Sequence, residues 1–212
     1  MSLKYPLDNR LYRVPNFVAW FYPKRIWSKK KSDAVYLTFD DGPHPDTTPW
    51  LILLLKKNNI KATFFFSGDQ AEQYPELVNQ VVAEGHAIGQ HGYEHISPKK
   101  QNLSEFKSNF IKARSILSTD LYRPPYGEIK PSQAKYVLTH GQLVMWSWMS
   151  YDWDQRLSVK EILFRFKSDV KDGDITVFHE NEKSKNRLKE IIPEIINIVR
   201  DKGLNFAALN NN

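Results

Sequence analysis

The sequence predicts an α/β fold built on a parallel sheet. Seven short runs rich in β-branched and aromatic residues alternate with six segments of helical periodicity. This alternation is typical of parallel strands joined by right-handed helical crossovers, and it fits both a barrel and a doubly wound sheet. In addition, ionisable side chains follow five of the seven predicted strands. Because the carboxyl ends of parallel strands line the active site in such folds, we expect these side chains to converge.

The predicted strands are short and the helical segments between them have recognisable ends. The strands are expected at residues 34–39, 62–66, 86–90, 121–123, 142–147, 174–179 and 206–209. The helices are expected at residues 50–58, 75–84, 103–117, 131–140, 158–170 and 187–203. Thr48 before Pro49 predicts a helix start, and Gly85 and Gly141 predict helix ends. Pro193 is expected to kink the last helix or make it restart.

The composition is that of a folded domain with a sizeable core. The chain has 212 residues, of which 41% are hydrophobic and 13% aromatic. The absence of cysteine excludes disulfides, thiolate nucleophiles and Cys-based zinc sites, and leaves the compartment open. We expect neither a signal peptide nor a transmembrane segment in this chain, because no apolar run approaches the ~20 residues that span a bilayer. Localisation and oligomeric state stay open.

Residues 1–33 are predicted to form a basic, aromatic N-terminal arm ahead of a domain at 34–212. The arm holds eight Lys or Arg residues and two acidic ones, so the whole net charge of +6 lies there. We expect no nucleic-acid partner, because such a protein would carry basic residues around its cleft. The arm's aromatic residues are Phe17, Trp20, Phe21, Tyr22 and Trp27. Three prolines prevent one long amphipathic helix, so we expect the arm to pack on the domain; membrane-surface contact is the alternative.

The stretch "YLTFDDGPHP" at 36–45 places two carboxylates directly after the first predicted strand. Asp40 and Asp41 are neighbours on an extended segment, so their side chains should point in different directions and perform different tasks. One could bind a metal ion while the other acts as a base. The alternative is a plain turn, because Asp-Asp-Gly-Pro is also favourable turn chemistry.

The stretch "QHGYEH" contains two histidines, His91 and His95, at a spacing that brings imidazoles together on a helical turn or tight loop. Together with Asp41 they would supply three ligands and leave a position open, as in catalytic metal sites. Zinc and non-haem iron share this ligand set, so it does not identify the metal. A pair of surface or core histidines is the alternative.

Two later motifs carry further reactive groups. "YRPPYGE" is stiffened by two prolines, and its Arg123 could pair with a carboxylate and keep it ionised. His179 ends the apolar run "DITVFH" and could act as a general acid near neutral pH. The alternatives are a rigid loop with a surface arginine and a hydrogen-bonded core histidine.

The motifs "TFDDGP", "HGYEH", "RPPYG", "YDW" and "VFH", in this order, resemble those of the NodB-homology polysaccharide deacetylases, carbohydrate esterase family four. The resemblance spans about residues 34–209 and implies a distorted (β/α) barrel of about seven parallel strands. It implies metal-dependent removal of N-acetyl groups from a chitin-like or peptidoglycan-like glycan, with Zn²⁺, Co²⁺ or another divalent ion. An O-acetyl carbohydrate esterase, a silent glycan-binding protein and an Fe(II) oxygenase are the alternatives.

The resemblance also implies a role for each motif residue. The set comprises Asp40 as general base, Asp41, His91 and His95 as metal ligands, Arg123 as partner of the base, Tyr126 as backbone donor to the oxyanion, His179 as general acid, and Trp153, Val177 and Pro124 as substrate-binding residues. Two positions depart from the family pattern. Met149 stands where relatives commonly have an Asp that tunes the catalytic histidine, so we expect a lower pKa for His179 than in typical relatives. Whether Asp152, one residue before Trp153, reaches His179 stays open. Gly92 replaces a Ser or Thr whose hydroxyl could brace the loop.

Overall fold

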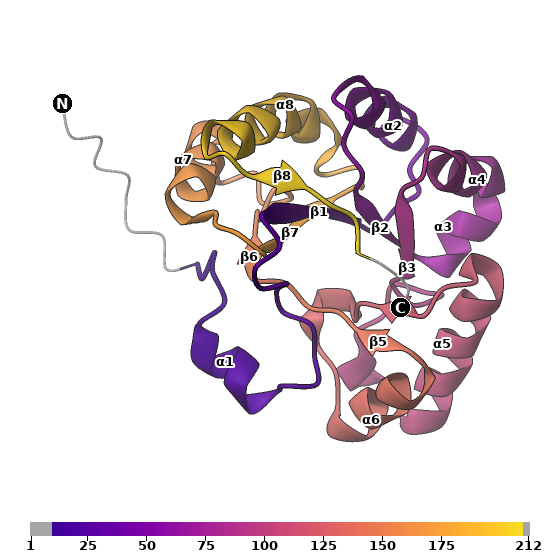
Figure 1. The fold of residues 1–212 in the computed structure, drawn as a ribbon. Coiled ribbons are helices and arrows are strands. Elements are labelled where there is room, and N and C mark those ends of the chain that lie inside the picture. Colours follow the sequence, from indigo (N-terminus) through magenta and orange to yellow (C-terminus); the bar gives the residue numbers. More distant parts are fainter. Residues whose placement is uncertain (1–9, 210–212) are drawn as a thin grey trace.

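Eight strands form one curved sheet in the computed structural model, which describes residues 10–209 (Figure 1). The strands are β1 (Ala34–Asp40), β2 (Thr63–Phe66), β3 (Ala87–Gln90), β4 (Leu121–Tyr122), β5 (Gln142–Leu143), β6 (Trp148–Met149), β7 (Ile175–His179) and β8 (Asn205–Phe206). Their order is β5-β4-β3-β2-β1-β7-β6, with β8 paired to β1. All pairings between these strands are parallel. The predicted distorted (β/α) barrel of about seven parallel strands is confirmed.

Helices surround the outer face of this sheet (Figure 1). They are α1 (Asn16–Phe21), α2 (Thr48–Lys57), α3 (Gly68–Gln73), α4 (Pro75–Ala83), α5 (Leu103–Leu117), α6 (Pro131–His140), α7 (Val159–Asp169) and α8 (Lys185–Asp201), with the short 3₁₀ turns η1 (Pro98–Lys100) and η2 (Pro125–Gly127). The sequence did not predict α1 and α3. The expected restart at Pro193 is wrong, because α8 continues through it as one helix. Burial of the apolar face around Pro193 outweighs the loss of one backbone hydrogen bond there.

The predicted strand at 142–147 is a strand only at its first two residues, as β5, and a second strand, β6, begins one residue beyond the predicted range. β5 pairs with β4, whereas β6 pairs with β7 at the other end of the strand order. Four residues separate β5 from β6, so the segment 142–149 crosses from one edge of the sheet to the other and completes the ring. A single straight strand could not pair with both neighbours, and the chain bends between the two halves.

Strand β1 divides its side chains between the two faces of the sheet. Val35, Leu37 and Phe39 belong to the main hydrophobic core beneath the helices and are fully buried. Thr38 and Asp40 alternate with them and therefore point to the opposite face, into the barrel. The strand period thus places a carboxylate inside the barrel mouth at the last position of β1.

The predicted arm is tied to the bend that closes the barrel. Residues 12–14 exchange backbone hydrogen bonds with residues 147–149, and Ile26 exchanges them with residues 143–145. The first nine residues of the predicted arm, which include Lys4 and Pro6, lie outside the described range. No helix among residues 10–209 has the length and apolar character needed to cross a bilayer.

Candidate active site

A cavity of about 620 Å³ opens at the carboxyl ends of the strands. The predicted site residues that line it are Asp40, Asp41, His91, His95, Pro124, Tyr126, Trp153 and His179. Arg123 and Val177 are fully buried and are not among its lining residues. Side chains from five separate stretches of the sequence therefore meet at one opening.

Asp40 is held by a buried arginine. Arg123 Nη1 donates hydrogen bonds to Asp40 Oδ1 at 2.6 Å and to Thr38 Oγ1 at 2.7 Å, and Nη2 donates to the carbonyl of Met145 at 3.0 Å. The guanidinium also lies over the ring of Phe65, 4.0 Å from its centroid. Burial lowers the pKa of Arg123 and the charge of Asp40 opposes this, but an arginine side chain stays cationic in proteins. The ion pair therefore fixes the position of the Asp40 carboxylate at the edge of the cavity.

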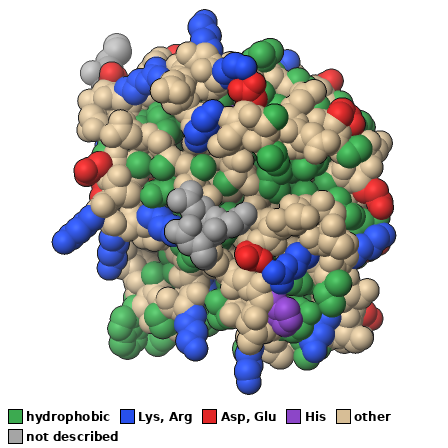
Figure 2. Space-filling view, turned by 45° about the vertical axis from the view of Figure 1, so that its right-hand side comes forward, with side chains coloured by type: hydrophobic (Ala, Val, Ile, Leu, Met, Phe, Trp, Pro, Cys, Tyr) green, Lys and Arg blue, Asp and Glu red, His purple; other side chains and the backbone are tan. Residues whose placement is uncertain are grey.

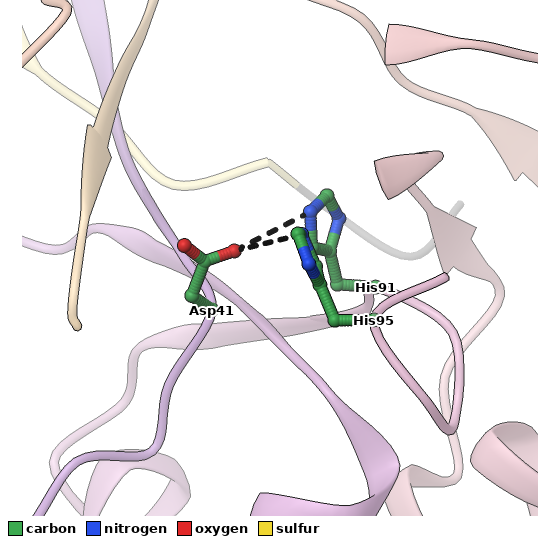
Figure 3. A group of neighbouring side chains, drawn as sticks. All are labelled: Asp41, His91 and His95. Carbon is green, nitrogen blue, oxygen red and sulfur yellow. Dashed lines mark ion pairs between the residues drawn. The ribbon is translucent and has the colours of Figure 1, made fainter. Parts of the chain in front are cut away.

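Asp41 points to different partners from Asp40. Its backbone is in the left-handed region, with φ 76°, and this turns the side chain towards the histidine loop (Figure 3). Asp41 Oδ1 lies 3.1 Å from His95 Nε2 and 3.7 Å from His91 Nε2. Asn181 Nδ2 donates a hydrogen bond to the other oxygen, Oδ2, at 2.7 Å.

The donor atoms of Asp41, His91 and His95 fit a divalent cation. The Nδ1 atom of His91 lies 2.8 Å from the carbonyl of Arg123, which can only accept, so Nε2 presents a lone pair to Asp41. Burial lowers the pKa of His91 to about 4, which keeps the ring neutral. Asp41 Oδ1 is buried and accepts no hydrogen bond.

The spacing of these atoms agrees with that interpretation. One donor atom from each residue lies within 4.8 Å of the others. Tetrahedral coordination with bonds of ~2.1 Å would place ligand atoms about 3.4 Å apart, and the two separations from Asp41 Oδ1 are 3.1 and 3.7 Å. Lone pairs that face a carboxylate at this range repel one another unless a cation lies between them.

His179 has a buried carboxylate partner. Asp152 Oδ1 lies 2.8 Å from His179 Nδ1, and Asp152 Oδ2 accepts the backbone N–H of His179 at 2.9 Å. Ser150 Oγ donates to Asp152 Oδ1 at 2.7 Å. The ring of Trp153 packs edge-on against His179 with centroids 4.3 Å apart. This arrangement fixes the imidazole with its Nδ1–H on the carboxylate and leaves Nε2 for the cavity.

Asp152 is therefore the carboxylate partner that Met149 cannot be, and the reason for expecting a lower pKa of His179 does not hold. Burial does lower this pKa, but the charge and hydrogen bond of Asp152 and the charges of Asp41 and Asp40 outweigh burial and raise it to about 9. Met149 lines the cavity and leaves the role of histidine partner to Asp152, the residue directly before Trp153.

The loop with Gly92 is braced from α5. Asn109 Oδ1 accepts the backbone N–H of Tyr93 at 2.8 Å, and its Nδ2 donates to the carbonyl of Glu94 at 3.3 Å. Gly92 has φ 81°, and a Cβ atom there would come within 2.8 Å of Asn109 Oδ1. Gly92 thus makes room for the side-chain amide of Asn109, which braces the loop in place of the hydroxyl found in the family pattern.

Tyr126 also adopts the left-handed conformation, with φ 60°. Its ring lies beside His95, with centroids 4.7 Å apart, and stays largely exposed at the cavity mouth. Two prolines precede it in the chain and stiffen this turn.

Sequence reasoning missed two polar residues of the site. The first is Asn181, which donates a hydrogen bond to Asp41. Its position in the sequence could have indicated it, because it lies two residues beyond His179 and alternate residues of an extended segment share a face. Glu180 is the second: it is buried, its Oε1 accepts a hydrogen bond from Thr48 Oγ1 at 2.7 Å, and its Oε2 has no partner. Burial, aided by the charge of Asp41 and opposed by the bond from Thr48, raises the pKa of Glu180 to about 8.

Glu180→Gln is expected to remove a pH-dependent loss of stability. The folded protein binds a proton on Glu180 up to about pH 8, whereas the unfolded chain releases it near 4.5. The free energy of unfolding should therefore fall as the pH rises between these values, and glutamine keeps the acceptor for Thr48 without titrating. Urea unfolding near both pH values measures this. Glu190→Gln, at an exposed position of α8, is the control; equal pH slopes for wild type and Glu180→Gln would contradict the assignment.

The comparisons with known proteins agree on one family. The model of the polysaccharide deacetylase family matches residues 28–144. A peptidoglycan-N-acetylglucosamine deacetylase of Bacillus cereus is 35% identical over 187 residues, which cover 82% of this chain and 66% of that protein. The peptidoglycan-N-acetylglucosamine deacetylase PgdA of Listeria monocytogenes is 32% identical over 164 residues, which cover 73% of this chain and 34% of that protein.

A solved structure extends the similarity over nearly the whole chain. The Bc1960 peptidoglycan N-acetylglucosamine deacetylase, in complex with 4-naphthalen-1-yl-N-oxidanyl-benzamide, has a TM-score of 0.80 and 32% identity, and covers 92% of this chain and 95% of its own. The chain spans just under two thirds of the Bacillus cereus relative and about one third of the Listeria relative. The family match covers more than half of the 212 residues. The chain therefore belongs to the polysaccharide deacetylase family, carbohydrate esterase family four.

Proposed function

We propose that this chain is a metal-dependent deacetylase that hydrolyses the N-acetyl groups of N-acetylglucosamine residues in a peptidoglycan-like glycan. One observation carries this proposal: an arginine-held carboxylate, a group of three metal-binding side chains and a carboxylate-paired histidine surround a single cavity. The relatives named as peptidoglycan-N-acetylglucosamine deacetylases support the substrate class. Residues 34–212 would form the catalytic domain, with residues 1–33 as an arm.

Asp41, His91 and His95 would hold the divalent cation. Two imidazoles and a carboxylate suit Zn²⁺, and Co²⁺ accepts the same donors. When bound, the ion would polarise the acetyl carbonyl and lower the pKa of a water molecule. Asn181 supports the site, since its hydrogen bond to Asp41 Oδ2 leaves Oδ1 facing the histidines.

Asp40 acts as the general base. Its carboxylate accepts a proton from the attacking water while the water oxygen bonds to the acetyl carbon. Arg123 keeps the carboxylate ionised and oriented before the reaction. The backbone N–H of Tyr126, at the mouth of the same cavity, would donate to the oxyanion that forms on the former carbonyl oxygen.

His179 acts as the general acid. Its raised pKa keeps a proton on Nε2 at neutral pH, and this proton passes to the glycan nitrogen as the C–N bond breaks. Free amine and acetate result. Asp152 stabilises the imidazolium before transfer and holds Nδ1–H throughout. Trp153 and Pro124 contribute apolar walls to the cavity beside these groups. Val177 lies fully buried outside the lining.

The same groups would also cleave an O-acetyl ester, because the alkoxide is a better leaving group than an amide nitrogen. A silent glycan-binding protein gains no support from Met149, since Asp152 supplies the carboxylate that Met149 cannot. The substrate panel therefore includes both kinds of acetyl group.

Acetate release is the test. Chelated protein should release no acetate, and protein reloaded with Zn²⁺ or Co²⁺ should release it from chitooligosaccharides or peptidoglycan fragments in preference to acetylxylan. The variant Asp46→Asn is a matched control, because Asp46 belongs to a second group of possible metal-binding side chains, with His44 and Glu182, and its change should leave the metal dependence of acetate release intact. Folded, metal-loaded protein that releases acetate from no member of the panel would refute the proposal.

A further inference from the structure

The described part of the arm projects a short helix away from the barrel. Residues 12–14 and Ile26 are bound through backbone hydrogen bonds to the segment 143–149. Between these two attachments the chain leaves the sheet, and α1 stands apart from the other elements (Figure 1). No residue of α1 is buried. The arm is thus fixed at both ends and free in its middle.

This free middle displays aromatic side chains to solvent. Phe17 is 62% exposed, Trp20 75%, Phe21 65% and Tyr22 48%. With Leu11 they make up five of the twelve large hydrophobic side chains that are exposed between residues 10 and 209. The other seven are spread over the remainder of the domain. Such a concentration on one short helix marks a surface that binds something apolar.

Basic side chains accompany the aromatic ones. Lys24, Lys30 and Lys31 are exposed, and Arg25 lies over the ring of Tyr22 at 4.1 Å. Arg10 and Arg13, by contrast, are paired with Asp154 and Asp174 of the domain. On the face drawn in Figure 2, Lys and Arg side chains lie scattered among hydrophobic ones.

The surplus charge lies in the projecting segment and directly after it. Residues 15–33 contain five Lys or Arg residues and one acid, a surplus of four positive charges, whereas residues 34–212 are neutral in sum. Lys24 and Arg25 precede the attachment at Ile26, and the other three cations follow it. The described lysines of the arm, Lys24, Lys29, Lys30 and Lys31, do not line the active-site cavity. The positive charge of this segment therefore favours an anionic partner that binds at α1 rather than at the active site.

Two candidate partners fit this surface poorly. A second copy of the chain would bring two surpluses of four positive charges together, and like charges across an interface oppose association. A soluble anionic glycan would satisfy the lysines but leave Phe17, Trp20 and Phe21 in water. Aromatic rings beside lysines instead match the interface of an anionic bilayer, where the rings lie at headgroup level and the ammonium groups meet lipid phosphates.

We propose that α1 and the lysines that follow it in the chain dock this protein peripherally on an anionic phospholipid bilayer, with Phe17, Trp20 and Phe21 inserted among the headgroups. Pro15 and Pro23 flank the helix and keep it short, so the insertion is shallow. The proposal is independent of the reaction in the cavity.

Sedimentation of the full chain with vesicles tests this inference. We expect binding to vesicles of phosphatidylglycerol and phosphatidylcholine, weak binding to phosphatidylcholine alone, and release as salt rises. The double variant Trp20→Ser/Phe21→Ser and the triple variant Lys24→Gln/Lys30→Gln/Lys31→Gln should each lower the vesicle partition coefficient by about tenfold. All five positions are exposed, so the fold should persist.

The control is a pair of exposed residues of the same types on α2, which lies across the barrel from α1 in Figure 1. Leu53→Ser/Lys57→Gln should leave vesicle binding unchanged, since Leu53 is 67% exposed and no other large hydrophobic side chain of α2 is exposed beside it. Absence of binding to anionic vesicles at low salt would overturn the proposal. So would equal binding by wild type and both α1 variants, or a dimer in solution that Trp20→Ser/Phe21→Ser abolishes without any vesicle binding.

Discussion

Asp40→Asn is expected to lower the rate of acetate release by about 10³-fold, the contribution typical of a positioned general base, while the bound metal is retained. Asparagine keeps an oxygen that can accept the hydrogen bond from Arg123 Nη1, now 2.6 Å from Asp40 Oδ1. It cannot accept the proton of the attacking water. Because Asp40 is not one of the three side chains that form the metal group, metal content should equal that of wild type.

The measurement combines initial rates on the best substrate with metal analysis of the purified variant. A thermal unfolding curve shows whether Arg123, which then lacks an anionic partner, destabilises the fold. Asp46→Asn serves again as the matched control, since it makes the same chemical change at an exposed aspartate. A rate within a few-fold of wild type for Asp40→Asn would show that another group takes the proton.

Asp152→Asn is expected to reduce the rate by about 10²-fold or more and to move the high-pH limb of the rate profile to lower pH. The carboxylate is what raises the pKa of His179 to about 9 against the effect of burial. Without that charge the pKa falls, so the acid form of His179 is lost at a lower pH. A cation bound at Asp41 would lower the pKa in both proteins, and the difference between them would remain.

The pH profile separates this role from a structural one. Ser150→Ala removes the hydrogen bond from Ser150 Oγ to Asp152 Oδ1 without removing the charge, so it should shift the high-pH limb much less. The unfolding free energy gives a second readout. The raised pKa of His179 contributes stability that is fully present below about 6.5 and is lost as the pH rises through about 9. Asp152→Asn should flatten that dependence; an unchanged pH–rate profile would contradict the assignment.

Local pattern was sufficient to predict a parallel sheet and most of the site, whereas the choice of a barrel over a doubly wound sheet came from the family resemblance. Alternating strands and helices with ionisable residues at strand ends imply a parallel sheet whose mouth collects them, because strand direction is the same throughout. Asp40, Asp41, His91, His95 and His179 follow from that rule, and the structure places them around one cavity. The period of the strand predicted different directions for the two aspartates, and in the structure the left-handed backbone of Asp41 sets its direction.

Partnerships between distant residues required the tertiary structure. Asp152 and Met149 are three residues apart, and the position of the 148–152 segment against β7 decides which of them reaches His179. The neutral form of Glu180 depends on how completely helices and loops exclude water from it. Such burial cannot be predicted from the sequence around Glu180, because it arises only when segments far apart in the chain pack together.

The arm shows the same division. The sequence by itself determined that residues 1–33 carry the net charge and a run of aromatic side chains, since both are properties of composition. Only the tertiary structure decided which of those aromatic residues are exposed. Backbone hydrogen bonds at residues 12–14 and at Ile26 use the free edges of the segment that closes the barrel, and the chain between them must leave the surface. Exposure depends on what the rest of the fold leaves available for packing, and no local pattern within the arm contains that information.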